Sequence, residues 1–259
     1  MIFVLGGRGF VGSAFVRALR AAGREHVILD RASYAAHAGQ PCDLFINANG
    51  NSRKPLAASQ PLVDFDASVR VVRQTLVDFP ARAYLLLSSC DVYPDCSDPR
   101  AAVESTPLDP ARQSPYGFHK HLAEQCVQHA ANNWLVFRMG GLVGPGLWKN
   151  AIFDILKGGP LWLHPDSQLQ FMSTDWAATT MLALADRGLS GQTFNLAGAG
   201  VIALRDALAA VPHAVTLAPD APRVRYEVSV DRLRAHLPVP DSRATVLDFI
   251  RAELARRDR

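Results

Sequence analysis

Apolar residues along this chain gather in short runs that alternate with segments of helical periodicity. The first run, Met1–Leu5, is followed by glycines and then by apolar positions at helical spacing, Phe15, Val16 and Leu19, before a second run, Val27–Leu29. A short apolar run flanked by turn residues is typical of a buried strand, whereas apolar residues spaced three to four apart indicate a helix. The N-terminal segment is therefore predicted to form a β-α-β unit.

The same alternation continues through the first 150 residues. Three further buried strands are predicted at 44–47, 83–87 and 134–138, with helices over 61–79 and 114–131 between them. Strands that alternate with helices favour a parallel sheet covered on both faces. The predicted fold class is α/β, a Rossmann-type doubly wound parallel sheet.

After residue 150 the alternation becomes less regular. The pattern predicts helices at 151–157 and 175–187, strands near 169–172 and 193–196, then a helix from 201, short strands at 215–217 and 224–230, and a final amphipathic helix. We assign residues 1–150 to a dinucleotide-binding domain that carries the catalytic residues. Residues 151–259 are assigned mainly to a small C-terminal substrate-binding lobe, with segments that return to the sheet.

The glycines after the first strand predict a phosphate site. Gly6 permits the tight turn, Gly9 lets the backbone approach a pyrophosphate, and Gly12 allows the following helix to pack close to the strand. The N-terminus of that helix favours an anion. Arg8, Phe10 and Val11 lie within the same turn and are included in the predicted cofactor site.

The end of the second strand bears on the choice of dinucleotide. Asp30 lies 18 residues beyond Gly12, close to the offset at which a carboxylate binds the adenosine ribose of NAD. Arg8 and Arg31 flank this position, and a guanidinium can bind the 2′-phosphate of NADP. NAD is the favoured cofactor and NADP remains an alternative; a turn-forming role for Asp30 is also open.

Polar residues follow the next strand at the predicted ligand edge of the sheet. Asn47, Ala48 and Asn49 end this strand and are assigned to the cofactor site. Asn51, Ser52 and Arg53 continue over the same edge and are assigned to substrate binding.

Tyr116 and Lys120 lie one turn apart on a predicted helix. An ammonium beside a phenol favours the phenolate and lowers the pKa of the tyrosine, which makes Tyr116 a candidate acid or base. Ser89 ends a predicted central strand, where its hydroxyl could bind a substrate carbonyl or alcohol. Ser89, Tyr116 and Lys120 together indicate hydride transfer at a C–OH/C=O centre.

Composition excludes several other classes of protein. The 259 residues are 49% hydrophobic and carry a net charge of +3, which suits a globular protein and predicts no nucleic-acid partner. The histidines and four cysteines show no metal-binding spacing, so no metal is expected. The chain has no apolar stretch of membrane-spanning length and no basic segment before its first apolar run, which together predict a cytoplasmic protein with no membrane partner.

These motifs resemble those of the extended short-chain dehydrogenase/reductases, the NAD-dependent epimerase/dehydratase family. The glycine turn is similar to its G-x-x-G-x-x-G, the segment 88–93 to its S-[ST]-x-x-V-Y, and Tyr116 to Lys120 to its Y-x-x-x-K. The resemblance implies a catalytic role for Ser89, binding of the nicotinamide ribose by Lys120, a sugar or nucleotide-sugar substrate, and a homodimer.

Local resemblance within the family is strongest to GDP-fucose synthase-like reductases, whose acid/base pair is a cysteine and a histidine. Here Cys90 is offset by one residue, and Lys149 follows the Gly-Pro turn in place of the histidine. Cys90, Asp91 and Lys149 are accordingly assigned to substrate binding. The favoured function is NAD(P)-dependent reduction of a keto-sugar; the alternatives are a nucleotide-sugar epimerase that retains NAD and a non-catalytic NAD(P)-sensing regulatory protein.

Overall fold

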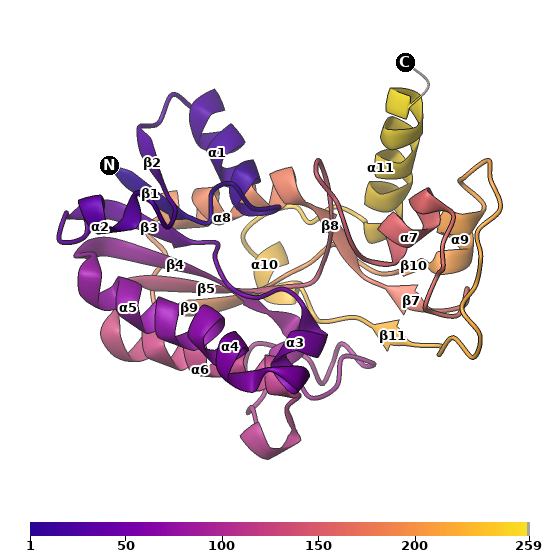
Figure 1. Cartoon of the computed structure of the whole chain (residues 1–259), viewed down its shortest axis with the longest axis horizontal. Helices are drawn as coiled ribbons and strands as arrows, with labels where there is room; N and C mark the ends of the chain where they lie inside the picture. The colour runs from indigo at the N-terminus through magenta and orange to yellow at the C-terminus, as the bar shows by residue number, and fades with distance from the viewer. Residues whose placement is uncertain (258–259) are drawn as a thin grey trace. The chain divides into compact units, whose positions relative to one another are not determined.

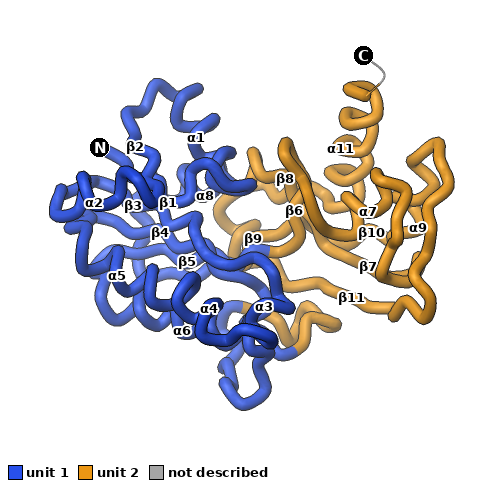
Figure 2. The backbone as a smooth tube through the Cα atoms, in the orientation of Figure 1, with its two compact units in different colours: residues 1–94, 104–139, 178–194 blue, residues 95–103, 140–177, 195–259 orange. Residues whose placement is uncertain are grey.

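The computed structural model describes residues 1–257, which form two compact units (Figure 1, Figure 2). Unit 1 contains residues 1–94, 104–139 and 178–194, and unit 2 contains residues 95–103, 140–177 and 195–257. The predicted boundary at residue 150 therefore falls inside a unit 2 segment, and residues 178–194 of the predicted lobe belong to unit 1.

Unit 1 is built around a sheet whose strands follow the order β2-β1-β3-β4-β5-β9. The neighbours β1 and β2, β1 and β3, β3 and β4, and β4 and β5 run parallel. The strand bounds are β1 (Ile2–Leu5), β2 (His26–Leu29), β3 (Cys42–Asn47), β4 (Ala81–Ser89), β5 (Trp134–Met139) and β9 (Gln192–Leu196). The predicted doubly wound α/β fold is confirmed.

Helices cover both faces of this sheet: α1 and α8 lie on one side, and α5 and α6 on the other (Figure 1). Their bounds are α1 (Gly12–Ala21), α2 (Tyr34–His37), α3 (Lys54–Ser59), α4 (Pro61–Phe65), α5 (Val71–Asp78), α6 (Pro115–Ala130) and α8 (Thr174–Asp186). Ser114 caps α6, since its Oγ accepts a hydrogen bond from the Gly117 amide at 3.1 Å, and Pro115 fits the first turn.

The core beneath α5 and α6 is aromatic. Phe45 stacks on Tyr84 with ring centroids 5.2 Å apart, and Phe79 meets Phe3 edge-on at 5.6 Å. The buried Tyr84 hydroxyl is bonded to Asn47 and Thr75 at 2.7 Å each. Packing of the aromatic rings therefore fixes the strands that end at the candidate site.

Unit 2 contains two small sheets. One pairs β6 (Gly141–Val143) with β8 (Phe171–Ser173) in parallel; the other has the order β10-β7-β11. The remaining elements are β7 (Gln168–Leu169), β10 (Ile202–Ala203), β11 (Arg225–Tyr226), α7 (Ala151–Lys157), α9 (Leu204–Leu208), α10 (Asp231–Arg234) and α11 (Ser242–Arg257). Ile152, Ile155, Val246 and Ile250 bring α7 and α11 into one buried cluster.

Several predicted elements differ from those observed. The single helix predicted at 61–79 is divided by a π-helical turn, Asp66–Arg70, and is preceded by α3. The strand predicted at 224–230 is reduced to β11, and the strand at 215–217 to an isolated bridge at Leu217. Short segments of this kind depend on their partners more than on local propensity.

Candidate active site

The glycine turn after β1 has the tight geometry that its sequence predicts. Gly6 has φ +78°, and a Cβ there would lie 2.9 Å from the Ala48 carbonyl oxygen. A Cβ on Gly12 would lie 2.1 Å from the Gly6 carbonyl oxygen, to which the Gly9 amide donates at 2.8 Å. The turn is folded so closely onto itself that a side chain at Gly6 or Gly12 would displace its backbone.

Around this turn, Arg8 is exposed, whereas Phe10 and Val11 are half-buried before α1. Asp30 follows β2; one carboxylate oxygen accepts the Ala32 and Ser33 amides at 3.0 Å each, and the other lies 3.3 Å from Arg8. Hydrogen bonds from Ser33 are the main cause of the lowered pKa of Asp30. The carboxylate thus forms the turn that the sequence left open as an alternative, and Arg31 beside it is exposed.

The end of β3 packs against this turn through its backbone, and the side chain of its last residue points into the protein. Asn47 is fully buried: its Nδ2 donates to the Tyr84 hydroxyl at 2.7 Å, and its Oδ1 accepts the Asn49 amide at 3.1 Å. The polar side-chain atoms of Asn47 are thus used inside the protein, and the assignment of this residue to the cofactor site stays a prediction. Ala48 is half-buried and Asn49 is exposed.

The structure brings Ser89, Tyr116 and Lys120 together. Ser89 is the last residue of β4 and is hydrogen-bonded to the side chain of Tyr116 in the first turn of α6. The Lys120 Nζ lies 5.7 Å from the centroid of the Tyr116 ring, and all three residues are buried. The spacing in the sequence predicted the Tyr116–Lys120 neighbourhood; the contact with Ser89 depends on the fold.

Gly117 explains how α6 reaches this position, and the sequence analysis missed it. A Cβ at Gly117 would lie only 2.0 Å from the Asp91 carbonyl oxygen. The absence of a side chain therefore allows the first turn of α6 to approach the Cys90–Val92 turn that follows Ser89. The sequence signal that could have identified Gly117 is its position directly after the candidate catalytic Tyr116.

The electrostatics of Tyr116 correct one expectation. Burial is the main cause that raises the pKa of Tyr116 above its ordinary value, and the charge of Asp91 adds to it; the hydrogen bond with Ser89 acts in the opposite direction. The predicted lowering of this pKa by Lys120 is not observed. Burial also lowers the pKa of Lys120, while the charges of Asp64, Asp91 and Glu124 oppose that change.

Asp91 is fixed between two partners. Ser89 Oγ donates to its Oδ2 at 2.9 Å, and Lys54 Nζ lies 2.7 Å from its Oδ1. The Asp91 side chain is 16% exposed, whereas that of Lys54 is 60% exposed. Lys54 was not among the predicted site residues, although it belongs to the polar segment that contains Asn51, Ser52 and Arg53.

The other predicted substrate residues have different surroundings. Cys90 is fully buried, and its Sγ donates to the Arg138 carbonyl oxygen at 3.1 Å; its part in substrate binding stays a prediction. Asn51 donates to Asp64 Oδ1 at 2.7 Å, while Ser52 and Arg53 are exposed. Lys149 belongs to unit 2, where its Nζ lies 5.0 Å from the Trp148 ring centroid.

A second buried network connects α6 to β5. Arg138 forms a paired contact with Glu124, the shortest distance being 2.8 Å, and also donates to the Tyr93 hydroxyl at 2.8 Å. Ser88 Oγ donates to Glu124 at 2.5 Å. This network holds the helix that carries Tyr116 and Lys120 against the strand beside Ser89.

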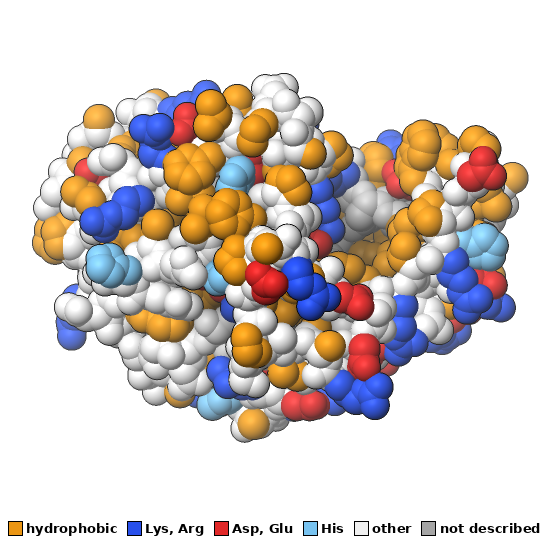
Figure 3. Space-filling view, turned by 90° about the horizontal axis from the view of Figure 1, so that it is seen from below, with side chains coloured by type: hydrophobic (Ala, Val, Ile, Leu, Met, Phe, Trp, Pro, Cys, Tyr) orange, Lys and Arg blue, Asp and Glu red, His pale blue; other side chains and the backbone are white. Residues whose placement is uncertain are grey.

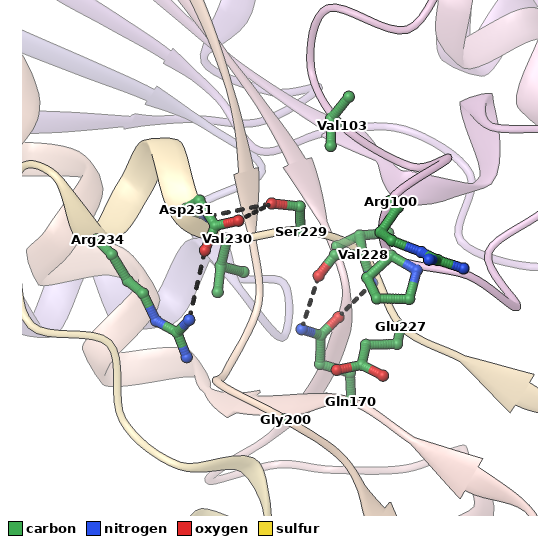
Figure 4. A pocket seen from close by; sticks show the side chains of 11 residues that line it. Arg100, Val103, Gln170, Gly200, Glu227, Val228, Ser229, Val230, Asp231 and Arg234 are labelled. Atoms are coloured by element: carbon green, nitrogen blue, oxygen red, sulfur yellow. Dashed lines mark hydrogen bonds and ion pairs between the residues drawn. The ribbon is translucent and has the colours of Figure 1, made fainter.

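Unit 2 has a cavity of its own, of about 450 Å³ (Figure 4). Gln170 is one of the residues that line it; its Nε2 donates to the Gly198 and Val228 carbonyl oxygens, and its Oε1 accepts the Val228 amide. Ser229 and Arg234, which also line the cavity, both contact Asp231. The volume suits a small molecule, although polar groups at its wall already have partners within the protein: Arg100 is paired with Asp98, and Glu227 with Arg225.

The structure contains no cluster of metal-binding side chains among residues 1–257. None of the helices in that range is long and apolar enough to cross a membrane. All four cysteines, which lie within it, are free thiols.

Comparison with known proteins defines the class to which this fold and site belong. Residues 2–197 match the model of the NAD dependent epimerase/dehydratase family, and the chain belongs to that family. No curated protein sequence matches the chain significantly.

Solved structures share the fold across their whole length. A UDP-galactose 4-epimerase is 22% identical, with a TM-score of 0.77 and 99% of each chain covered. A putative epimerase from Burkholderia cenocepacia is 20% identical, with a TM-score of 0.77 and 98% of each chain covered. The UDP-glucose 4-epimerase of Thermus thermophilus, in complex with NAD, is 20% identical, with a TM-score of 0.74 and 96% and 98% covered. At these identities the similarity concerns the fold.

Proposed function

We propose that this protein is an NAD-dependent oxidoreductase that transfers hydride at a carbinol or ketone carbon of a nucleotide sugar, and that it works as a keto-sugar reductase. The observation that carries the proposal is the buried group formed by Ser89, Tyr116 and Lys120, in which Ser89 is bonded to the phenol. A phenol, a hydroxyl and a lysine at the end of a central strand are suited to move one proton at one substrate oxygen.

The residues present fit a dinucleotide. The glycine turn is folded too tightly for side chains at its three glycines, because a Cβ on Gly6, Gly9 or Gly12 would lie within 3.1 Å of a backbone oxygen atom. In this proposal the backbone of that turn holds the pyrophosphate, Asp30 binds the adenosine ribose and Lys120 the nicotinamide ribose. NAD would supply the hydride donor and acceptor, which the side chains of the protein cannot provide.

Tyr116 has the protonation state that reduction requires. Burial keeps its hydroxyl protonated, so the phenol can give its proton to a carbonyl oxygen that becomes an alcohol. Ser89 can donate a hydrogen bond to the same oxygen once its hydroxyl turns from Asp91. The exposed Arg53, directly before α3, offers positive charge to a substrate with a diphosphate.

An epimerase that retains NAD is the second candidate. It is favoured by the family to which the chain belongs and by the named activity of two solved relatives. Such an enzyme oxidises a sugar alcohol and reduces the ketone again, so it uses the same three residues in both directions. The buried state of Cys90 argues against a third route, in which this thiol would enolise the substrate.

Tyr116→Phe tests the chemistry. We expect the variant to lose turnover of a panel of nucleotide sugars and 4-keto sugars by at least about 100-fold, the scale of general acid catalysis. Its melting temperature should still rise on addition of NAD, because the binding residues remain and ligand binding stabilises the folded state. The same assay with NADP compares the two dinucleotides. Full turnover by Tyr116→Phe would refute the mechanism.

Cofactor balance separates the two candidates. A reductase consumes one NADH for each sugar reduced, which the loss of absorbance at 340 nm measures. An epimerase interconverts two sugars with no net change in NADH. If no member of the panel is turned over while NAD still binds, a regulatory role without catalysis becomes the better explanation.

A further inference from the structure

A buried carboxylate and an imidazole lie next to the proposed catalytic lysine and have no part in the mechanism above. Asp64, in α4, is 0% exposed, and His119, in α6, is 7% exposed. His119 Nδ1 and Asp64 Oδ2 are 2.6 Å apart, although the two residues are 55 positions apart in the sequence. His119 directly precedes Lys120.

Asp64 is held in one orientation by three donors. Its Oδ2 accepts from His119, and its Oδ1 accepts from Asn51 Nδ2 at 2.7 Å and from Ser68 Oγ at 3.2 Å. Ser68 lies in the π-helical turn that follows α4. An ionised carboxylate can accept all three hydrogen bonds, and such bonds are what a buried charge requires.

Three carboxylates act on the Lys120 ammonium, and two of them are neutralised by other cations. Glu124 is paired with Arg138 at 2.8 Å, and Asp91 with Lys54 at 2.7 Å. Asp64 has an amide, a hydroxyl and an imidazole as its partners, none of which carries a permanent positive charge. Among the opposing charges, that of Asp64 has the largest effect on Lys120.

Lys120 itself has no ion pair within 4 Å among residues 1–257. A Cβ built on Gly50 would lie 3.0 Å from the Lys120 Nζ and 4.0 Å from the Ser68 Oγ, and this hydroxyl donates to Asp64 Oδ1 at 3.2 Å. The ammonium and the hydrogen-bonded carboxylate therefore lie in one neighbourhood. A buried ammonium in this position must be stabilised through space.

We propose that Asp64 is the counter-ion that keeps Lys120 protonated, and that His119 is a positioning residue that orients the carboxylate. This proposal depends on the proposed function only for the reason why Lys120 must be charged: in that function the protonated form of Lys120 acts on Tyr116 and on a ribose hydroxyl. The electrostatic link itself exists without cofactor or substrate. It can therefore be tested in the protein alone.

The test is a pH titration of Lys120 by NMR. The chain contains four lysines, Lys54, Lys120, Lys149 and Lys157, so ¹³C-lysine labelling gives few Cε signals, and Lys120→Arg assigns the one of interest. Asp64→Asn removes the charge and keeps the shape. We expect the midpoint of Lys120 to fall by about 1 pH unit in this variant, as for the loss of one nearby opposite charge.

Ser68→Ala is the matched control, because it removes one hydrogen bond to the same carboxylate but leaves the charge; the Lys120 midpoint should stay within about 0.3 pH units of the wild type. If Asp64→Asn does not fold with an unpaired His119, the double variant Asp64→Asn/His119→Gln replaces both partners with amides, and the same downward shift is expected.

An unchanged Lys120 midpoint in the charge-removing variants would overturn the proposal. A shift of equal size in Ser68→Ala would also overturn it, because the effect would then come from packing. These outcomes do not depend on turnover or on NAD, so failure of the proposed oxidoreductase function and failure of the counter-ion role can be told apart.

Discussion

Tyr116 is buried beside Ser89, and under the proposed function its protonation decides which direction of hydride transfer is faster near neutral pH. Burial, and then the charge of Asp91, raise its pKa above the ordinary value of 10.0. The phenol is thus the main form at every pH below about 10. A phenol is ready to donate a proton in reduction, whereas oxidation requires the scarce phenolate.

The pH dependence of the two directions should therefore differ. Oxidation of a sugar alcohol is expected to accelerate by up to about tenfold per pH unit between about pH 7 and about pH 9, because the phenolate fraction grows with pH while the phenol dominates. Reduction should stay nearly constant over the same range. Initial rates of NADH formation and consumption measure both, and an oxidation rate independent of pH would contradict the assignment of Tyr116.

Helix α6 is the element on which the candidate site depends. It carries Tyr116 in its first turn and His119 and Lys120 about one turn later, and Glu124 attaches it to β5 through Arg138. Both side chains of this ion pair are buried, at 1% and 6% exposure. A buried pair specifies the position of the helix, and removal of one partner leaves an uncompensated charge.

Glu124→Gln is expected to lower the free energy of unfolding by about 3–5 kcal/mol, since the Arg138 guanidinium would remain buried without its counter-ion. Glu253→Gln provides the control: its partner Arg256 is 74% exposed, and loss of an exposed pair should cost less than about 1 kcal/mol. Urea unfolding followed by circular dichroism measures both. Equal stability losses in the two variants would show that burial of the Glu124 pair has no special role.

At the scale of the whole molecule, the chain passes between its two units five times, after residues 94, 103, 139, 177 and 194. Unit 1 therefore depends on a segment from late in the sequence. Phe194 of β9 stacks on Phe137 of β5 with centroids 5.9 Å apart. Charges of both signs are interspersed on the surface seen in Figure 3, and many form ion pairs, such as Arg100 with Asp98 at 2.7 Å.

A fragment of residues 1–150 should not fold on its own. It would lack β9 and α8, so β5 would become an edge strand and Phe137 would lose its buried partner. We expect low soluble yield and no cooperative unfolding transition for the fragment, against a cooperative transition for the full chain. Cooperative thermal unfolding of the fragment, followed by circular dichroism, would contradict this view of unit 1.

Local sequence signals predicted much of unit 1. Strand bounds agree closely, because buried strands such as β4 are continuous apolar runs. The close approach at Gly12 and the proximity of Tyr116 to Lys120 were likewise predicted from residues a few positions apart in the sequence. The short strands of unit 2 were predicted less well, because their partners are distant in the chain.

By itself, then, the sequence determined the alternation of strands and helices, the glycine turn and the helical spacing of Tyr116 and Lys120. Each of these follows from backbone geometry over a few residues. Only the tertiary structure decided that Asp64 meets His119, that Lys54 meets Asp91, and that Cys90 is buried. It also reversed the expected change in the pKa of Tyr116, because burial and the charges brought near by folding have no signature in local sequence.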